Sequence, residues 1–143
     1  MTFGKDIVLA TDGSDFSQQA ARTIVLAGLL PDGGTVHVVY VVAPLPAHAM
    51  RYLNRETVQD WYADEAAKAL EPAAAVLEAA GVACVTQSLV GAAAQEIVRY
   101  ADAIDARMIV MGAHGRGMVL DAVIGSVAGR VLSFAKRPVL LVP

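Results

Sequence analysis

The period of the hydrophobic pattern switches repeatedly along this chain, and that switching is the strongest constraint on its fold. Short, continuous apolar runs such as Ile7–Ala10 and Val36–Val42 are typical of strands buried on both faces of a parallel sheet. Longer segments between these runs carry apolar residues three or four positions apart, which is the spacing of a helix packed on a sheet. The alternation predicts an α/β fold, an open five-stranded parallel sheet with helices on both faces.

The predicted strands cover residues 7–10, 36–42, 82–89, 108–111 and 139–142. Five strands joined by right-handed crossovers suit the order 3-2-1-4-5, with the third strand at an edge, a Rossmann-like arrangement. In such a sheet the order reverses between strands one and four, and ligands bind at the carboxyl ends of the strands near that point. This rule directs attention to Asp12 and to the loop after Met111. At 143 residues the whole chain, 1–143, is expected to be a single domain.

The connecting segments carry their own signals. Ser14 or Asp15 is expected to cap the first helix, and the stretch 43–53, which has two prolines and no period, is expected to be a loop. Pro72 lies inside the predicted helix 54–80 and predicts a kink or a break there. In the last helix, Val127, Val131 and Phe134 are expected to face inward.

Composition excludes several classes of protein. Eleven basic and 14 acidic residues give a net charge of −3, which argues against non-specific binding to nucleic acid or to an anionic membrane. Cys84 is the single cysteine, so an internal disulfide scaffold is excluded. No apolar run reaches the ~18 residues that a membrane-spanning helix needs, and the first residues do not read as a signal peptide. A soluble, cytoplasmic protein is expected.

A glycine-rich segment follows the fourth strand. It begins Gly112-Ala113-His114-Gly115-Arg116-Gly117, and Gly125-Ser126 then opens the last helix. Glycine allows close approach of backbone to ligand, and the free N–H groups at a helix start favour an anion. The segment therefore suits a polyphosphate cradle, although an ordinary surface loop could also contain these glycines. The Walker pattern of P-loop proteins is absent. A dinucleotide-binding fingerprint would follow the first strand, whereas these glycines follow the fourth, so neither motif is supported.

The spacing Gly112-x2-Gly115-x9-Gly125-Ser126 resembles the nucleotide-binding pattern of the universal stress protein family, in its ATP-binding branch. The resemblance spans the chain: residues 7–14 look like the family's first strand and turn, and residues 109–116 like its fourth strand and loop. Residues 125–128 and 137–140 look like its closing helix and strand.

This resemblance implies a site and its ligand. Asp12 is similar to the acid that contacts the nucleoside, Val41 matches the position whose backbone meets the adenine, and Gly112 lies where the ribose is approached. The positions that match phosphate-holding groups are Gly115, Gly125, Ser126 and Val127, and His114 and Arg116 lie in the same loop. The implied ligand is ATP, or ADP or AMP, with Mg²⁺ held mainly through the phosphates and no direct metal site on the protein.

Three functions of different classes are compatible with such a fold. The first is an ATP-binding regulatory protein without efficient catalysis, because no nucleophile or second acid accompanies His114 at a readable spacing. The second is an interaction protein whose site stays empty; the glycine pattern counts against it, and the carboxylate of Asp121 in the loop supports it. The third, a phosphoacceptor receiver domain, needs carboxylates at the ends of strands one and three, and it is disfavoured because the third strand ends at Ser88-Leu89. For Asp12, a role in the turn before the first helix is the alternative to ligand contact.

The C-terminal strand predicts self-association. Val139–Val142 is an apolar edge strand bracketed by Pro138 and Pro143, and an unpaired edge favours pairing with a second copy. A homodimer through this strand is expected, together with protein partners that the sequence does not identify.

Overall fold

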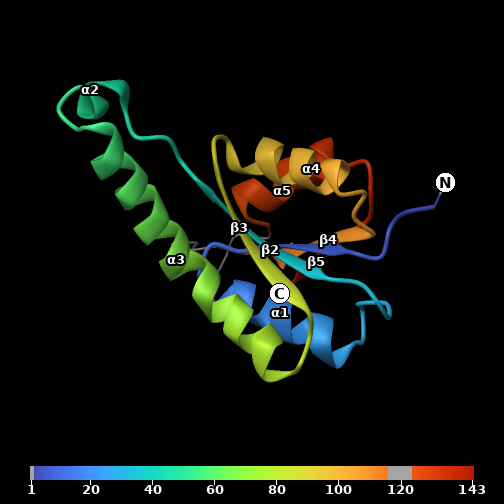
Figure 1. Cartoon of the computed structure of the whole chain (residues 1–143). Coiled ribbons are helices and arrows are strands. Elements are labelled where there is room, and N and C mark those ends of the chain that lie inside the picture. The colour runs from blue at the N-terminus through green and yellow to red at the C-terminus, as the bar shows by residue number, and fades with distance from the viewer. Residues whose placement is uncertain (1, 116–123) are drawn as a thin grey trace.

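A computed structural model describes residues 2–115 and 124–143, which form five strands and five helices. Figure 1 shows their arrangement. In chain order they are β1 (Ile7–Ala10), α1 (Asp15–Leu26), β2 (Val36–Val42), α2 (Ala47–Met50), α3 (Arg55–Ala79), β3 (Cys84–Val90), α4 (Ala93–Ala103), β4 (Met108–Gly112), α5 (Ser126–Phe134) and β5 (Val139–Val142).

The strands form one parallel sheet in the order β3-β2-β1-β4-β5. This confirms the predicted topology and places the switch point between β1 and β4. In the register of the sheet, Ile7 of β1 lies between Val36 of β2 and Met108 of β4. All four residues of β1 are buried, which is why the central strand reads as an unbroken apolar run.

Two hydrophobic cores lie on opposite faces of the sheet. Helices α1 and α3 cover one face, where Ile24 and Leu77 pack with Val38 and Val110. Helices α4 and α5 cover the other face, where Ile97 and Val131 join the buried cluster. Figure 1 shows the two helical layers on either side of the strands. This arrangement confirms helices on both faces.

Two differences from the predicted elements concern the segment between β2 and β3. Residues 47–50 form the short helix α2 within the stretch expected to be a loop. Helix α3 continues through Pro72 without a break. Proline removes one helical N–H, yet its neighbours Ala73 and Leu77 are completely buried against the sheet, so tertiary packing holds the helix together.

The predicted inward face of the last helix is only partly correct. Val131 is fully buried, but Val127 is 37% and Phe134 48% exposed. Ala128 is buried in place of Val127, because the small residue three positions before Val131 occupies the same side of the helix.

Polar contacts tie the amino ends of the strands together. His37, near the start of β2, lies between Asp6 and Tyr100: its Nε2 is 2.9 Å from Asp6 Oδ2 and its Nδ1 is 2.8 Å from the Tyr100 hydroxyl. The Thr35 N–H also donates to Asp6 Oδ1. Burial raises the pKa of Asp6, but the hydrogen bonds from His37 and Thr35 and the charge of His37 outweigh it, so that pKa lies below its ordinary value.

Arg137, just before β5, forms a second anchor. Its side chain, 8% exposed, contacts the carboxylates of Asp102 at 3.0 Å and Asp105 at 3.7 Å. The guanidinium also donates to the Ala106 carbonyl and lies 5.2 Å from the centre of the Phe3 ring. One arginine therefore joins the end of α4, the approach to β4 and the N-terminal segment. Within residues 2–115 and 124–143, no helix is long and apolar enough to cross a membrane.

Candidate functional site

A cavity of about 250 Å³ opens at the carboxyl ends of β1, β2 and β4, beside the start of α5. This is the position that the switch-point rule predicts for a ligand site. The described residues lining it are Ala10, Thr11, Asp12, Ser17, Tyr40, Val41, Ala93, Ile97, Met111, Gly112, Ala113, His114, Gly115, Gly125, Ser126, Val127 and Ala128.

The turn after β1 fixes the Asp12 carboxylate. Asp12 Oδ1 accepts hydrogen bonds from the Ser14 N–H and the Ser17 hydroxyl, both at 2.9 Å. The Ser17 oxygen also accepts from the Asp12 N–H at 3.1 Å. Ser14, not Asp15, is the N-cap of α1, and its side chain accepts from Ser17 N. Asp12 therefore does serve the turn, through Oδ1, and its backbone and side chain are held in place at the rim of the cavity.

The other oxygen of this carboxylate lies next to the glycine-rich loop. A Cβ atom on Gly115 would come within 2.7 Å of Asp12 Oδ2, which is closer than two such atoms approach in proteins. At Gly112 a Cβ would meet Phe16 Cβ at 2.8 Å. At these two positions glycine allows the loop after β4 to lie directly against the first turn and α1.

The start of α5 completes the rim. The Gly125 N–H donates to the Ala113 carbonyl at 2.7 Å, and the Ala113 N–H donates to the Val142 carbonyl at 2.8 Å. These bonds tie the beginning of α5 to the ends of β4 and β5. Gly125 is the N-cap, and it supplies no side-chain hydrogen bond to the N–H groups of the first turn. Ser126 and Val127 line the cavity, so the partial positive charge of the helix N-terminus lies at its rim.

His114 stands between the loop and α1. Its ring packs edge-on against the Phe16 ring with centroids 5.3 Å apart. Its Nδ1 atom is buried, and no hydrogen-bond partner for it is found among the described residues. A buried polar atom without a partner costs about 1–3 kcal/mol, so a ligand that satisfied Nδ1 would gain affinity there.

The other end of the cavity is apolar. Val41 and Tyr40 come from β2, Ala93 and Ile97 from α4, and Met111 from β4. These side chains form a surface that suits a flat, weakly polar group such as a nucleobase. The cavity thus has an apolar end and a rim that carries Asp12, His114 and the helix N-terminus. Among its described lining residues there is no lysine or arginine.

The structure brings together eight of the nine predicted site residues around this cavity: Asp12, Val41, Gly112, His114, Gly115, Gly125, Ser126 and Val127. The ninth, Arg116, and the carboxylate of Asp121 lie outside the described residues. Their proximity agrees with a shared site, and the role of each in binding stays a prediction. Within the described part of the chain, no group of three or more His, Cys, Asp or Glu side chains could hold a metal ion.

Sequence reasoning missed several lining residues. Ile97 and Ser17 both line the cavity, and neither was predicted as a site residue. Ser17 is 4% exposed, and the only signal in the sequence was its position five residues after Asp12. Ala93 carries no chemical signal and is recognised only from the fold.

Comparison with known proteins identifies the family. The model of the Universal stress protein family matches residues 4–143. The chain belongs to this family. A universal stress protein of Methanocaldococcus jannaschii is 36% identical over 143 residues, which is 96% of this chain and 81% of that protein. One from Thermus aquaticus is 32% identical over 96% of this chain and 98% of its own.

The extent of the match varies among relatives. A universal stress protein of Synechocystis is 33% identical over 94% of this chain, but this covers only 41% of that protein. The chain therefore spans less than half the length of that relative. The matches to the Methanocaldococcus jannaschii and Thermus aquaticus proteins cover most of this chain and most of each relative.

Solved structures of universal stress proteins have the same fold. The protein from Burkholderia pseudomallei is 27% identical with a TM-score of 0.69, covering 97% of this chain and 96% of its own. UspA from Lactobacillus plantarum has a TM-score of 0.78 at 20% identity, with complete coverage of both chains.

Other universal stress proteins of this fold were solved with nucleotides. One is in complex with cAMP (24% identical, TM-score 0.62, 99% and 98% coverage), and one from Archaeoglobus fulgidus is in complex with dAMP (23%, 0.64, 99% and 100%). One from Arabidopsis thaliana has AMP bound (15%, 0.66, 97% and 91%). At these identities the likeness concerns the fold.

Proposed function

We propose that this universal stress protein binds an adenine nucleotide, ATP in particular, in the cavity at the carboxyl ends of β1, β2 and β4. The observation that carries the proposal is the convergence of Asp12, Gly115 and the start of α5 on one cavity. Asp12 lies about a hundred positions before the other two in the sequence, and the resemblance assigned each of them to the nucleotide. The solved complexes of proteins with this fold contain cAMP, dAMP and AMP, which supports the adenylate class.

The cavity fits the parts of an adenine nucleotide in order. The base occupies the apolar end formed by Val41, Ile97 and Met111 and reaches the backbone of Val41. The ribose lies near Gly112 and Asp12, and the phosphates meet the N–H groups at the start of α5 and the His114 ring. No lysine or arginine is among the described lining residues, so backbone donors and base burial supply most of the affinity. Mg²⁺ is held mainly through the phosphates.

The nucleotide serves regulation, with no efficient turnover. The His114 ring lines the cavity and packs edge-on against Phe16. A general base must reach the proton of the attacking water; in this proposal His114 contacts a phosphate oxygen instead. The nucleotide-bound and nucleotide-free states of the protein then present different surfaces to protein partners. Partner binding would therefore depend on the concentration of the nucleotide.

A homodimer is part of this proposal. Val139, Leu140 and Leu141 of the edge strand β5 are only half-buried, and Leu132 and Phe134 on α5 are 45% and 48% exposed. Pairing of two copies along β5 would satisfy the free backbone groups of the edge. A two-fold axis at this edge makes the interface isologous.

Calorimetric titration of nucleotide-free protein tests the function. ATP, ADP, AMP and cAMP are titrated with and without Mg²⁺ into wild type and Gly115→Val. Micromolar binding, about −8 kcal/mol, is expected for wild type and is lost in the variant, whose side chain collides with Asp12. Gly129→Ala is the matched control, because nothing lies within 4 Å of a Cβ there, and it should bind as wild type does. No heat with any adenylate would instead identify an interaction protein of the same fold.

A further inference from the structure

Strand β3 forms the edge of the sheet opposite β5, and its outer side has no partner strand in the described part of the chain. It pairs with β2 along its whole length, from Val36↔Cys84 to Val42↔Val90. Figure 1 is seen from this edge, with β3 in front of the other strands and the two helical layers on either side of it. The strand has seven residues, longer than the four of β5 at the other edge.

The ladder with β2 determines which backbone groups face outward. The Val36 N–H donates to the Ala83 carbonyl, and the Gly91 N–H donates to the Val42 carbonyl. In a parallel ladder every second residue of a strand bonds to a given neighbour. The odd-numbered residues from 83 to 91 therefore bond to β2, and Cys84, Thr86, Ser88 and Val90 present their N–H and C=O groups to the outside.

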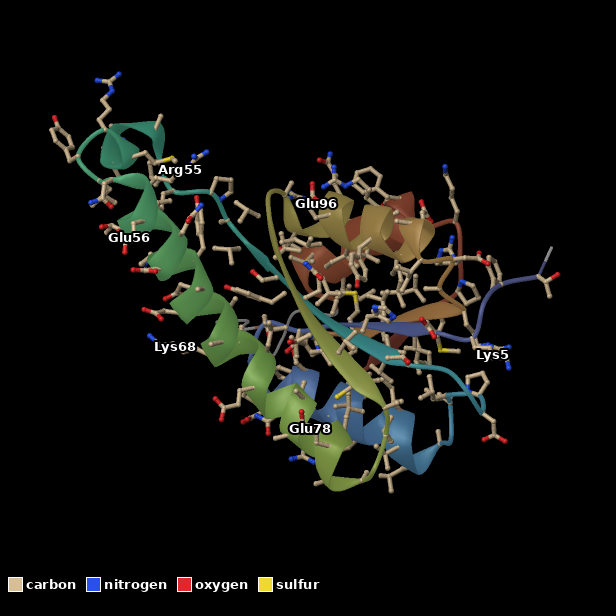
Figure 2. All side chains as sticks on the ribbon, viewed as in Figure 1. Lys5, Arg55, Glu56, Lys68, Glu78 and Glu96 are labelled. Atoms are coloured by element: carbon tan, nitrogen blue, oxygen red, sulfur yellow. The ribbon has the colours of Figure 1, made fainter. Side chains whose placement is uncertain are left out.

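This edge lacks the features that usually prevent strand pairing. The segment Cys84–Val90 contains no proline and no charged residue, whereas natural edge strands often carry lysine, proline or a bulge. Figure 2 shows Lys68 and Glu78 on α3 and Glu96 on α4, the helices that flank the strand. Val85 is 47% and Val90 44% exposed, so the helical layers leave these two apolar side chains of the edge uncovered.

We propose that β3 pairs antiparallel with β3 of a second copy of this chain. In the register that overlaps the strand completely with itself, Gln87 faces Gln87 of the other copy at the two-fold axis. Thr86 then faces Ser88, and Cys84 faces Val90. Because these are the outward residues, each of the four facing pairs exchanges two backbone hydrogen bonds.

The side chains are complementary in this register. Val85, with nearly half of its surface exposed, lies across from the half-buried Leu89, and hydroxyls meet at the Thr86–Ser88 pairs. Uncharged pairs occur throughout, so no like charges oppose one another. The Gln87 amide, which donates to the Ser88 carbonyl at 3.2 Å, gives up this contact, and the Thr86 N–H of the second copy replaces it.

Pairing at β3 has a geometric consequence for assembly. The edge at β3 and the edge at β5 are opposite ends of one sheet. If two-fold pairing occurs at both, copies join into an open chain with a continuous sheet, because the two axes do not coincide. If β3 alone pairs, the product is a closed dimer.

Disulfide trapping tests the register. Directly opposed residues that are not hydrogen-bonded have Cα atoms about 4.5 Å apart, within disulfide range. In a Cys84→Ser background, Gln87→Cys should form an intermolecular disulfide under mild oxidation, and Val90→Cys should not, because its counterpart lies about 20 Å away along the strand. With native Cys84 restored, Val90→Cys should crosslink to Cys84 of the other copy. Equal crosslinking of Gln87→Cys and Val90→Cys in the serine background would overturn the proposed register.

Sedimentation of the full chain provides a second readout that needs no added cysteine. Thr86→Pro removes an outward N–H that β2 does not use, and proline is accepted at such edge positions. Thr86→Val, the matched control, keeps the N–H. The average mass of wild type and Thr86→Val should exceed that of Thr86→Pro at equal concentration, with unchanged circular dichroism for all three. Identical masses for the three proteins, or a monomeric wild type, would overturn the proposal, and nucleotide binding is not needed for either test.

Discussion

Asp12 Oδ2 lies 2.7 Å from the place where a Cβ atom of Gly115 would stand. This contact joins the end of the first strand to the loop after the fourth, across the switch point of the sheet. Hydrogen bonds hold the carboxylate in this position, because its other oxygen accepts from the Ser14 N–H and the Ser17 hydroxyl. The proposed nucleotide site therefore depends on the absence of a side chain at Gly115.

The first prediction concerns this pair. Gly115→Ala should weaken ATP binding about tenfold, or ~1.4 kcal/mol, because the new methyl group displaces the Asp12 carboxylate. Asp12→Ala should weaken binding as well. Since both changes act through one carboxylate, the double variant should lose less than the sum of the two, and a double-mutant cycle by calorimetry measures this coupling. Strict additivity would show that Gly115 acts independently of Asp12.

The second prediction concerns the packing of the loop on α1. Gly112→Ala should lower the free energy of unfolding by about 1–3 kcal/mol, because its Cβ would meet Phe16 Cβ at 2.8 Å and Phe16 backbone carbon at 3.1 Å. Gly129→Ala, in an open position of helix α5, should raise it by about 0.5–1 kcal/mol. Urea unfolding followed by circular dichroism measures both. A neutral Gly112→Ala variant would contradict the close contact.

The third prediction concerns acid. The folded-state pKa of Asp6 lies below the ordinary 3.8, because the hydrogen bonds from His37 and Thr35 and the charge of His37 outweigh the effect of burial. A lowered carboxyl pKa stabilises the protein fully above the ordinary value, and this stability is lost as the pH falls through the folded-state pKa. Wild type should therefore be more stable than Asp6→Asn at pH 7, and the difference should shrink below about pH 4.

Urea midpoints measured from pH 7 to pH 3 check this dependence. Asp60→Asn, at an exposed position of α3, controls for the loss of one negative charge. A difference between wild type and Asp6→Asn that stays constant over the whole range would show that the Asp6 charge contributes nothing.

The fourth prediction concerns the anchor before β5. Arg137→Met should reduce the free energy of unfolding by about 1–3 kcal/mol, because it leaves the Ala106 carbonyl and the Asp102 carboxylate without their shared donor. Arg130→Met, at an exposed position on α5, should change it by less than about 0.5 kcal/mol. Thermal unfolding of the three proteins side by side separates the two effects, and equal losses would refute the role of Arg137.

The strands and their order in the sheet could be predicted from the sequence, because strands buried on both faces appear as short, continuous apolar runs. Val36–Val42 and Val139–Val142 were predicted with the bounds that the structure has, and the topology then located the cavity. Helix α2 was missed, since four residues in a proline-containing stretch carry no period. The continuity of α3 at Pro72 was missed because it depends on packing against the sheet, which a local signal does not contain.

The candidate site was predictable where glycine spacing and strand ends mark it, and less so elsewhere. Ser17 became recognisable only through its bonds to Asp12. Phe16 packs against both Gly112 and His114, and nothing in the sequence predicted this role. Contacts of this kind join residues about a hundred positions apart, and periodicity reports only on neighbours.

That separation along the chain also governs when the site can exist. The register of β1 with β4 pairs Ile7 with Met108, so Asp12 meets Gly115 only after most of the polypeptide has been synthesised. Three strands and four helices precede β4 in the chain, and pairings between such distant segments form slowly. On the ribosome, a growing chain therefore passes through a long interval in which its first half is made but the proposed nucleotide site is not yet assembled. The proposed nucleotide would bind only after the loop that follows β4 has packed against the turn after β1. A nucleotide present in the cell would then stabilise the fully folded chain by mass action.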